Sequence, residues 1–161
     1  FFNRTMTFAH RYFDGKLPPP GDREKVDTDQ IERCRDAAEG AARCFEECRF
    51  KAALAEVMSL ARAGNGYFDT TRPFATRKTD LQACGRAVNV CLQTARTLTT
   101  IMAPILPDTA EKCAAMLNLP EGWSHWSAAT DELPQGHPLS EPQILIKKLD
   151  AAALFAEEAS E

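Results

Sequence analysis

Residues 79–107 read TDLQACGRAVNVCLQTARTLTTIMAPILP, and this stretch decides the fold. Apolar residues recur every three or four positions between Leu81 and Met102. That spacing places them along one stripe of an α-helix. Thr79, with Gln82 three residues later, predicts the N-terminal cap, and the two prolines that close the stretch predict the C-terminal end. The sequence therefore predicts a long amphipathic helix that needs apolar partners.

The same spacing continues on both sides of this helix. Gly64 and Gly66 are expected to stop the helix that precedes it after residue 63. An earlier helix is expected to start at residue 27 or 28, because Asp27 and Gln30 have the spacing of a capping box. The predicted helices cover residues 1–13, 27–48, 50–63, 79–102, 108–117 and 144–160.

These elements predict an all-α fold, an antiparallel helical bundle of about five helices joined by short turns. We expect the bundle to occupy residues 1–143, with an irregular strap over residues 118–143 that contains Trp123 and Trp126. The tryptophans are expected to pin the strap to the bundle rather than to form a binding platform. Residues 144–161 are expected to form a closing helix and an acidic tail.

The length, net charge and motif content of the chain argue against several classes of function. Its 161 residues carry a net charge of −4, which argues against indiscriminate nucleic-acid binding but leaves room for a local basic site. We find no apolar run long enough to span a membrane, no secretory signal, and no nucleotide-binding or hydrolase motif. We expect a cytoplasmic protein, without a membrane partner and without a metal site in this chain.

The six cysteines and three histidines are the remaining candidates for chemistry. Cys44 and Cys48 share a helix face, but no second pair completes a structural zinc site. We expect all six cysteines to be free thiols that pack as small apolar side chains, with metal or redox chemistry as the alternative. The histidines are far apart in sequence, and we expect them to be surface or loop residues.

The segment Gly64–Lys78 is the strongest candidate for a binding site. Phe74 follows Pro73, which fixes the backbone, and cationic residues surround both. A rigidly held aromatic ring beside cations suits stacking on an unpaired base with phosphate nearby, although an ordinary loop anchor has the same pattern. Thr7 and Arg11 are one helical turn apart on the first helix, where a guanidinium and a hydroxyl can share one contact.

Together these residues resemble the helical anticodon-binding domain of class I aminoacyl-tRNA synthetases, and most closely that of methionyl-tRNA synthetases. The segments that carry the resemblance occur in the order of that family. They are Asn3–Thr5 with Tyr12–Lys16, Phe45–Met58, Asn65–Tyr67 with Arg72–Phe74 and Lys78, Pro104–Lys112, and Gly136–His137 with Ile144–Asp150.

The resemblance implies recognition of the CAU anticodon of methionine tRNA. Phe74 would then stack on an anticodon base, and Thr7 and Arg11 would read a base edge, while Pro73 and Lys78 belong to the same motif. The family usually has Trp at the position of Phe74 and often Asn at that of Thr7. Thr lacks the paired donor and acceptor of Asn.

The resemblance also implies that the catalytic part of the synthetase lies outside these residues. Its cofactor would be ATP, with zinc as a further candidate, whereas this chain would hold no cofactor and would not aminoacylate tRNA alone. The alternative is a helical scaffold or protein-interaction domain without RNA binding. In that case Phe74 would be buried and Arg11 would lie on a distant face.

Overall fold

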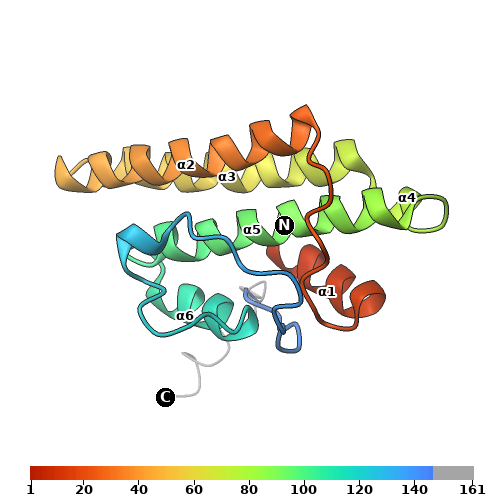
Figure 1. Cartoon of the computed structure of the whole chain (residues 1–161). Coiled ribbons are helices and arrows are strands. Elements are labelled where there is room, and N and C mark those ends of the chain that lie inside the picture. Colours follow the sequence, from red (N-terminus) through yellow and green to blue (C-terminus); the bar gives the residue numbers. More distant parts are fainter. Residues whose placement is uncertain (147–161) are drawn as a thin grey trace, which may run out of the picture.

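The computed structural model describes residues 1–146 and shows an all-α domain (Figure 1). Within these residues there is no β-strand, only an isolated bridge between Lys16 and Pro138. The helices are α1 (Phe2–Phe13), α2 (Lys25–Glu46), α3 (Phe50–Thr71), α4 (Pro73–Thr76), α5 (Leu81–Met102) and α6 (Pro107–Met116), with a 3₁₀ turn, η1 (Trp126–Ala128). The predicted fold class, a bundle of about five helices, is confirmed.

Helix α5 is the centre of the bundle. The antiparallel pair α2 and α3 lies along one side of α5, and α1 and α6 lie along the other (Figure 1). Every residue from Ala87 to Ile101 is buried, so α5 is enclosed on all its faces rather than on the single stripe that the sequence predicted. A helix with neighbours all round must bury polar side chains as well as apolar ones.

Most of the buried polar side chains of α5 form hydrogen bonds, as burial requires, although Asn89 Oδ1 has no partner among the described residues. The Asn89 amide donates to the carbonyl of Pro18 (2.8 Å) and so holds the connector between α1 and α2. The Gln93 amide donates to the carbonyl of Leu133 (2.9 Å) and accepts from the Leu133 N–H (2.8 Å). Helix α5 therefore positions both irregular segments of the domain.

Helix α2 starts two residues earlier than predicted, at Lys25. Asp27 is the third residue of the helix and accepts the backbone N–H of Glu24 at 2.8 Å, so it belongs to a capping box one turn before the predicted one. Asp27 is only 1% exposed, and it also accepts from the Tyr67 hydroxyl and from Arg86 Nε (2.8 Å). This carboxylate joins α2 to α3 and α5.

The predicted end of the third helix is wrong. Helix α3 continues through Gly64 and Gly66 as far as Thr71. Gly64 is buried, and a Cβ atom there would lie 2.9 Å from the ring of Phe1, so packing rather than chain termination accounts for this glycine. Arg72 ends the helix instead, with a left-handed φ of 48° immediately before Pro73.

Two further helix starts also differ from the prediction. The cap of α5 is Asp80, whose carboxylate accepts the N–H of Ala83 at 2.9 Å, and not Thr79. Helix α6 begins at Pro107, because proline suits the first helical position, where no backbone N–H is needed. Residues 144–146 are not helical, and the rest of the predicted closing helix lies outside the described residues.

The segment after α6 is irregular apart from η1. Trp126 packs edge to face on Phe45 with the ring centroids 5.7 Å apart, which confirms the predicted packing role of this tryptophan. The carbonyl of Trp123 accepts from the Thr100 hydroxyl at 2.8 Å. These contacts fix the segment to the end of α5 and to α2.

Candidate nucleic-acid interface

The connection between α3 and α5 presents Phe74 at one end of the bundle. Pro73 is buried, and its carbonyl accepts from the Arg77 N–H (3.0 Å) and from the Cys84 thiol (3.3 Å), so α4 is tied to α5. Phe74 is the second residue of this single helical turn and is 48% exposed. The ring is therefore presented to solvent from a fixed backbone.

Burial raises the pKa of the Cys84 thiol beneath this turn, while a hydrogen bond with Thr76 and the charge of Arg77 oppose the increase. The thiol is therefore protonated near neutral pH, which lets it donate to Pro73.

Helix α1 meets this turn at Tyr12. The guanidinium carbon of Arg77 lies 4.7 Å from the centroid of the Tyr12 ring, and that of Arg11 lies 5.5 Å from it. Arg77 Nε donates to the carbonyl of Phe74 at 3.0 Å. A continuous chain of contacts thus runs from Arg11 through Tyr12 and Arg77 to Phe74.

Some of the sequence-predicted residues lie on this chain of contacts, and others lie beside it. Arg11 and Phe74 lie on this chain of contacts, and both are exposed. Thr7 is exposed one turn before Arg11 on the same face of α1. Lys78 is exposed in the turn that follows α4. The structure therefore places these residues around one end of the bundle, with Pro73 buried beneath them.

Tyr12 and Arg77 were not predicted as site residues. The Tyr12 ring is held by Phe8, with ring centroids 4.5 Å apart, and Phe8 in turn contacts Phe68 of α3 at 5.9 Å. The four-residue interval between Phe8 and Tyr12 was the available sequence signal. The contact between Tyr12 and Arg77 joins distant segments, and no local pattern indicates it.

In the described part of the chain, the cations around Phe74 have no carboxylate partner. Among the described residues, the basic side chains with a carboxylate oxygen within 4.0 Å are elsewhere: Arg4, His10, Arg23, Lys25, Arg49 and Arg86. Arg11, Arg72, Arg77 and Lys78 form no such pair. Asp80, the acidic residue of the same connection, uses its carboxylate to cap α5. A protein with a net charge of −4 thus keeps a locally positive surface around Phe74.

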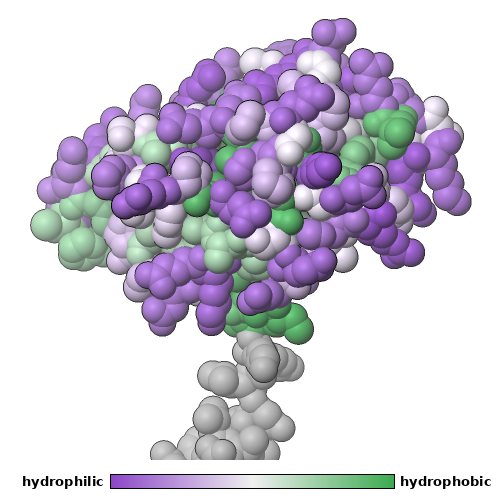
Figure 2. Space-filling view, turned by 60° about the horizontal axis from the view of Figure 1, so that its bottom comes forward, coloured by the Kyte–Doolittle hydropathy of each residue, from purple (hydrophilic) through white to green (hydrophobic). Residues whose placement is uncertain are grey.

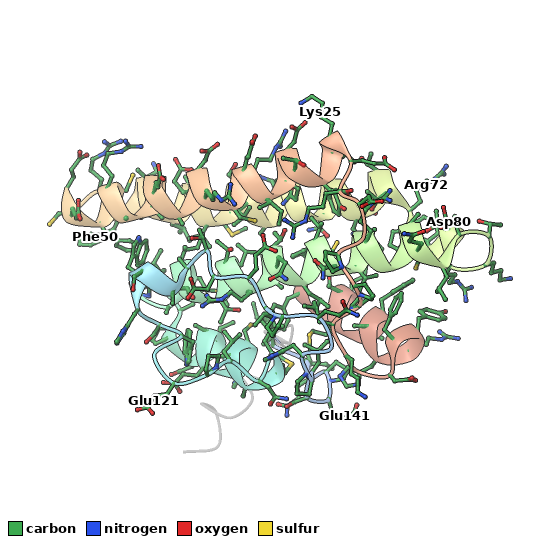
Figure 3. All side chains as sticks on the ribbon, in the orientation of Figure 1. Lys25, Phe50, Arg72, Asp80, Glu121 and Glu141 are labelled. Atoms are coloured by element: carbon green, nitrogen blue, oxygen red, sulfur yellow. The ribbon has the colours of Figure 1, made fainter. Side chains whose placement is uncertain are left out.

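Figure 3 shows Arg72 and Asp80, which lie on either side of α4, at one end of the domain and Phe50 at the other end. We call the surface formed by Thr7, Arg11, Tyr12, Phe74, Arg77 and Lys78 the α1–α4 surface. It combines an exposed aromatic ring with cations that have no carboxylate partner within residues 1–146.

The other candidates for chemistry have structural roles. His10 and His137 bond through Nε2 to the carbonyls of Ser140 (2.8 Å) and Leu117 (2.7 Å). All six cysteines are free, and five are buried, as predicted. The exception is Cys48, which is exposed in a left-handed conformation (φ 56°), so the prediction that it packs in the core is wrong.

Within residues 1–146, no three His, Cys, Asp or Glu side chains are grouped so that they could hold a metal ion. None of the helices in that range has both the length and the apolar character that a membrane crossing needs.

Comparison with known proteins places residues 17–158 in a family described as the anticodon binding domain of methionyl tRNA ligase. The methionine–tRNA ligase of Pyrococcus abyssi is 40% identical over 149 residues, which cover 92% of this chain and 20% of the relative. That of Salinibacter ruber is 34% identical over 172 residues, 98% of this chain and 24% of the relative. The chain thus spans about a fifth to a quarter of these curated relatives.

A solved structure supports the fold independently. The apo form of Mycobacterium tuberculosis methionyl-tRNA synthetase matches with a TM-score of 0.88 at 19% identity, over 92% of this chain and 31% of that one. At this level of identity the match establishes the fold alone. The resemblance inferred from the sequence motifs is confirmed by the family match, and the chain belongs to the family of anticodon-binding domains of methionyl-tRNA ligases.

Proposed function

We propose that this domain binds methionine tRNA by its CAU anticodon, as part of a methionine–tRNA ligase that attaches methionine to the tRNA with ATP. The ATP site, and any zinc site, would belong to the catalytic part of the same protein. The domain alone would bind tRNA weakly and would not aminoacylate it. We propose a cytoplasmic location, where tRNA charging takes place.

The observation that carries the proposal is the half-exposed ring of Phe74 among unpaired cations. An unpaired base can stack on an exposed aromatic side chain, and cations beside the ring can bind the backbone of the same nucleotide. Pro73 and the contacts of its carbonyl restrict the backbone that carries the ring, so little backbone entropy is lost on binding.

Arg11 and Thr7 would contact the edge of the stacked base. Arginine presents several N–H donors in a planar fork and can form two parallel bonds to acceptors on a base. The Thr7 hydroxyl supplies one donor and acceptor on the same exposed face of α1. This division assigns stacking to α4 and base reading to α1.

The first test compares binding of an RNA hairpin that carries CAU with one that carries another triplet on the same stem. We expect tighter binding of the CAU hairpin. Equal affinity for both hairpins would overturn the proposed recognition.

The second test replaces Phe74 with alanine in the full-length ligase. Base–aromatic stacking contributes about 1–3 kcal/mol, which corresponds to a loss of roughly one to two orders of magnitude in kcat/KM for tRNA. The matched control is Phe50→Ala, since Phe50 is 61% exposed and lies at the opposite end of the domain (Figure 3). Equal kcat/KM for tRNA in the Phe74→Ala and Phe50→Ala enzymes would show that Phe74 is not part of the binding site.

A second candidate function, a protein-interaction domain, has one observation in its favour. Phe50, Leu54 and Met58 follow each other at four-residue intervals along α3 and are 61%, 39% and 46% exposed. Figure 2 shows a mostly hydrophilic face with apolar patches at its left, its right and its lower centre. Loss of a protein partner by the Phe50→Ala variant, together with unchanged RNA binding, would support this function.

A further inference from the structure

We propose that Arg77 and Tyr12 form a phosphate-binding subsite that holds the RNA backbone beside the base stacked on Phe74. The proposal rests on the proposed function, because it assigns a second role within the same RNA-binding surface. Its ligand class is a phosphodiester of single-stranded RNA, and its two residues have different roles. Arg77 binds the phosphate, and Tyr12 positions Arg77.

Two contacts orient the guanidinium of Arg77. Its Nε donates to the carbonyl of Phe74 at 3.0 Å, and its guanidinium lies over the Tyr12 ring at 4.7 Å. These two contacts fix the plane of the guanidinium and leave both terminal nitrogens without a hydrogen bond among the described residues. A guanidinium held in this way loses little side-chain entropy when it binds an anion.

Arg77 has no acidic partner among the described residues. No carboxylate of the described residues lies within 4.0 Å of Arg77, whereas Arg86, on α5, contacts both Glu24 and Asp27. Arg86 thus has a structural role that Arg77 lacks. The two terminal nitrogens of Arg77 suit the paired oxygens of a phosphate, which arginine binds through parallel N–H donors.

Arg77 and Phe74 belong to the same short segment of the chain. Arg77 is three residues after Phe74 and is bonded to its carbonyl, so the guanidinium and the stacking ring are both carried by α4 and its C-terminal cap. A nucleotide whose base stacks on Phe74 keeps its own phosphate nearby, because the sugar joins the two. Contacts of this kind position the RNA without reading its sequence.

Tyr12 acts through Arg77. Its ring contacts Phe8 at 4.5 Å, and Phe8 packs against the apolar core, so the ring is a fixed support. Cation–π attraction requires the aromatic face and not the hydroxyl. Phenylalanine at position 12 should therefore preserve the subsite, and alanine should not.

The test measures the affinity of the whole chain for the CAU hairpin and the mismatched hairpin over a salt series of about 50–200 mM. We expect Arg77→Ala to weaken both complexes by the same factor, about tenfold. The slope of log affinity against log salt should fall in magnitude by about 0.7, the value for one phosphate contact with a single strand. The Arg77→Lys variant should keep the slope and lose part of the affinity. Tyr12→Ala should lose at least as much affinity, because it also removes the ring beside Arg11, and Tyr12→Phe should keep the wild-type affinity.

The matched control is Arg43→Ala, which removes an arginine from the last turn of α2, at the end of the bundle away from α4 (Figure 1). The subsite is overturned if Arg77→Ala behaves as this control does, or if it weakens only the CAU complex with the salt slope unchanged. A wild-type chain that shows no preference for CAU overturns the proposed anticodon recognition instead, and the salt slope of Arg77→Ala still decides the subsite. Circular dichroism confirms that each variant is folded.

Discussion

Replacing Asp27 by asparagine should cause a large loss of stability. The carboxylate is 1% exposed and accepts from Tyr67, Arg86 and the backbone N–H of Glu24. An amide has one acceptor oxygen, so it cannot serve all three donors, and it removes the negative charge opposite Arg86. Breaking a buried pair by changing one partner typically destabilises by 3–5 kcal/mol. Arg86 keeps its contact with Glu24, so we expect about 3 kcal/mol.

Urea unfolding followed by far-UV circular dichroism measures this change. In thermal unfolding, the same loss of about 3 kcal/mol should lower the melting temperature by roughly 6–12 °C in a domain of this size. Asp29→Asn is the matched control, because Asp29 pairs with the exposed Lys25 on the same helix and its loss should have no measurable effect. If both variants unfold at the same urea concentration, the carboxylate does not join the three helices as we describe.

Three further predictions concern single residues. Cys48 alone should react quickly with a thiol reagent in the native protein, because the other five cysteines are buried. Cys48→Ser should abolish this fast phase and lower the number of thiols that react after denaturation from six to five. Gly66→Ala should raise stability by about 0.5–1 kcal/mol, since no atom lies within 4 Å of the new Cβ. Gly64→Ala should lack this gain because its Cβ meets Phe1, and equal melting temperatures for the two variants would refute that difference. Burial raises the pKa of the Cys113 thiol from 9.0 to about 12. The free energy of unfolding is therefore unaffected by this thiol below pH 9.0 and decreases as pH rises toward 12, because the thiol ionises more readily in the unfolded chain. Cys113→Ala should therefore reduce the loss of stability in alkaline denaturation curves, and an unchanged curve would contradict the assignment.

The helices could be predicted from sequence because their apolar spacing and most of their ends are local features. The starts of α2, α5 and α6 differ from the prediction by one or two residues for local reasons of capping, whereas the errors at Gly64 and Cys48 have other causes. Glycine lowers helix stability by about 1 kcal/mol, yet Gly64 lies within α3 because its missing side chain makes room for Phe1. Cys48 follows the apolar stripe of α2, but the helix ends at Glu46 and the left-handed backbone turns the thiol outward. Neither effect is visible in the spacing of residues.

The candidate site was predictable in part for the same reason. Pro73 and Phe74 are adjacent, and Thr7 and Arg11 are one turn apart, so local patterns identify each pair. The contact between Tyr12 and Arg77 depends on how α1 packs beside α4, and only the folded chain shows it. Phe8 and Tyr12 are four residues apart, so their contact could be inferred from the sequence, but the packing of Phe8 against Phe68 of α3 needs the structure.

The left-handed conformation of Arg72 has a consequence for how the surface evolves. Residues with a side chain adopt this conformation at a cost of roughly 1 kcal/mol or more, and glycine adopts it freely. A change of Arg72 to glycine would relax the backbone while removing one positive charge from the edge of the surface. If this surface binds RNA as proposed, stability and RNA affinity oppose each other at this position. Selection for thermal stability alone would favour glycine, and selection for affinity would retain arginine.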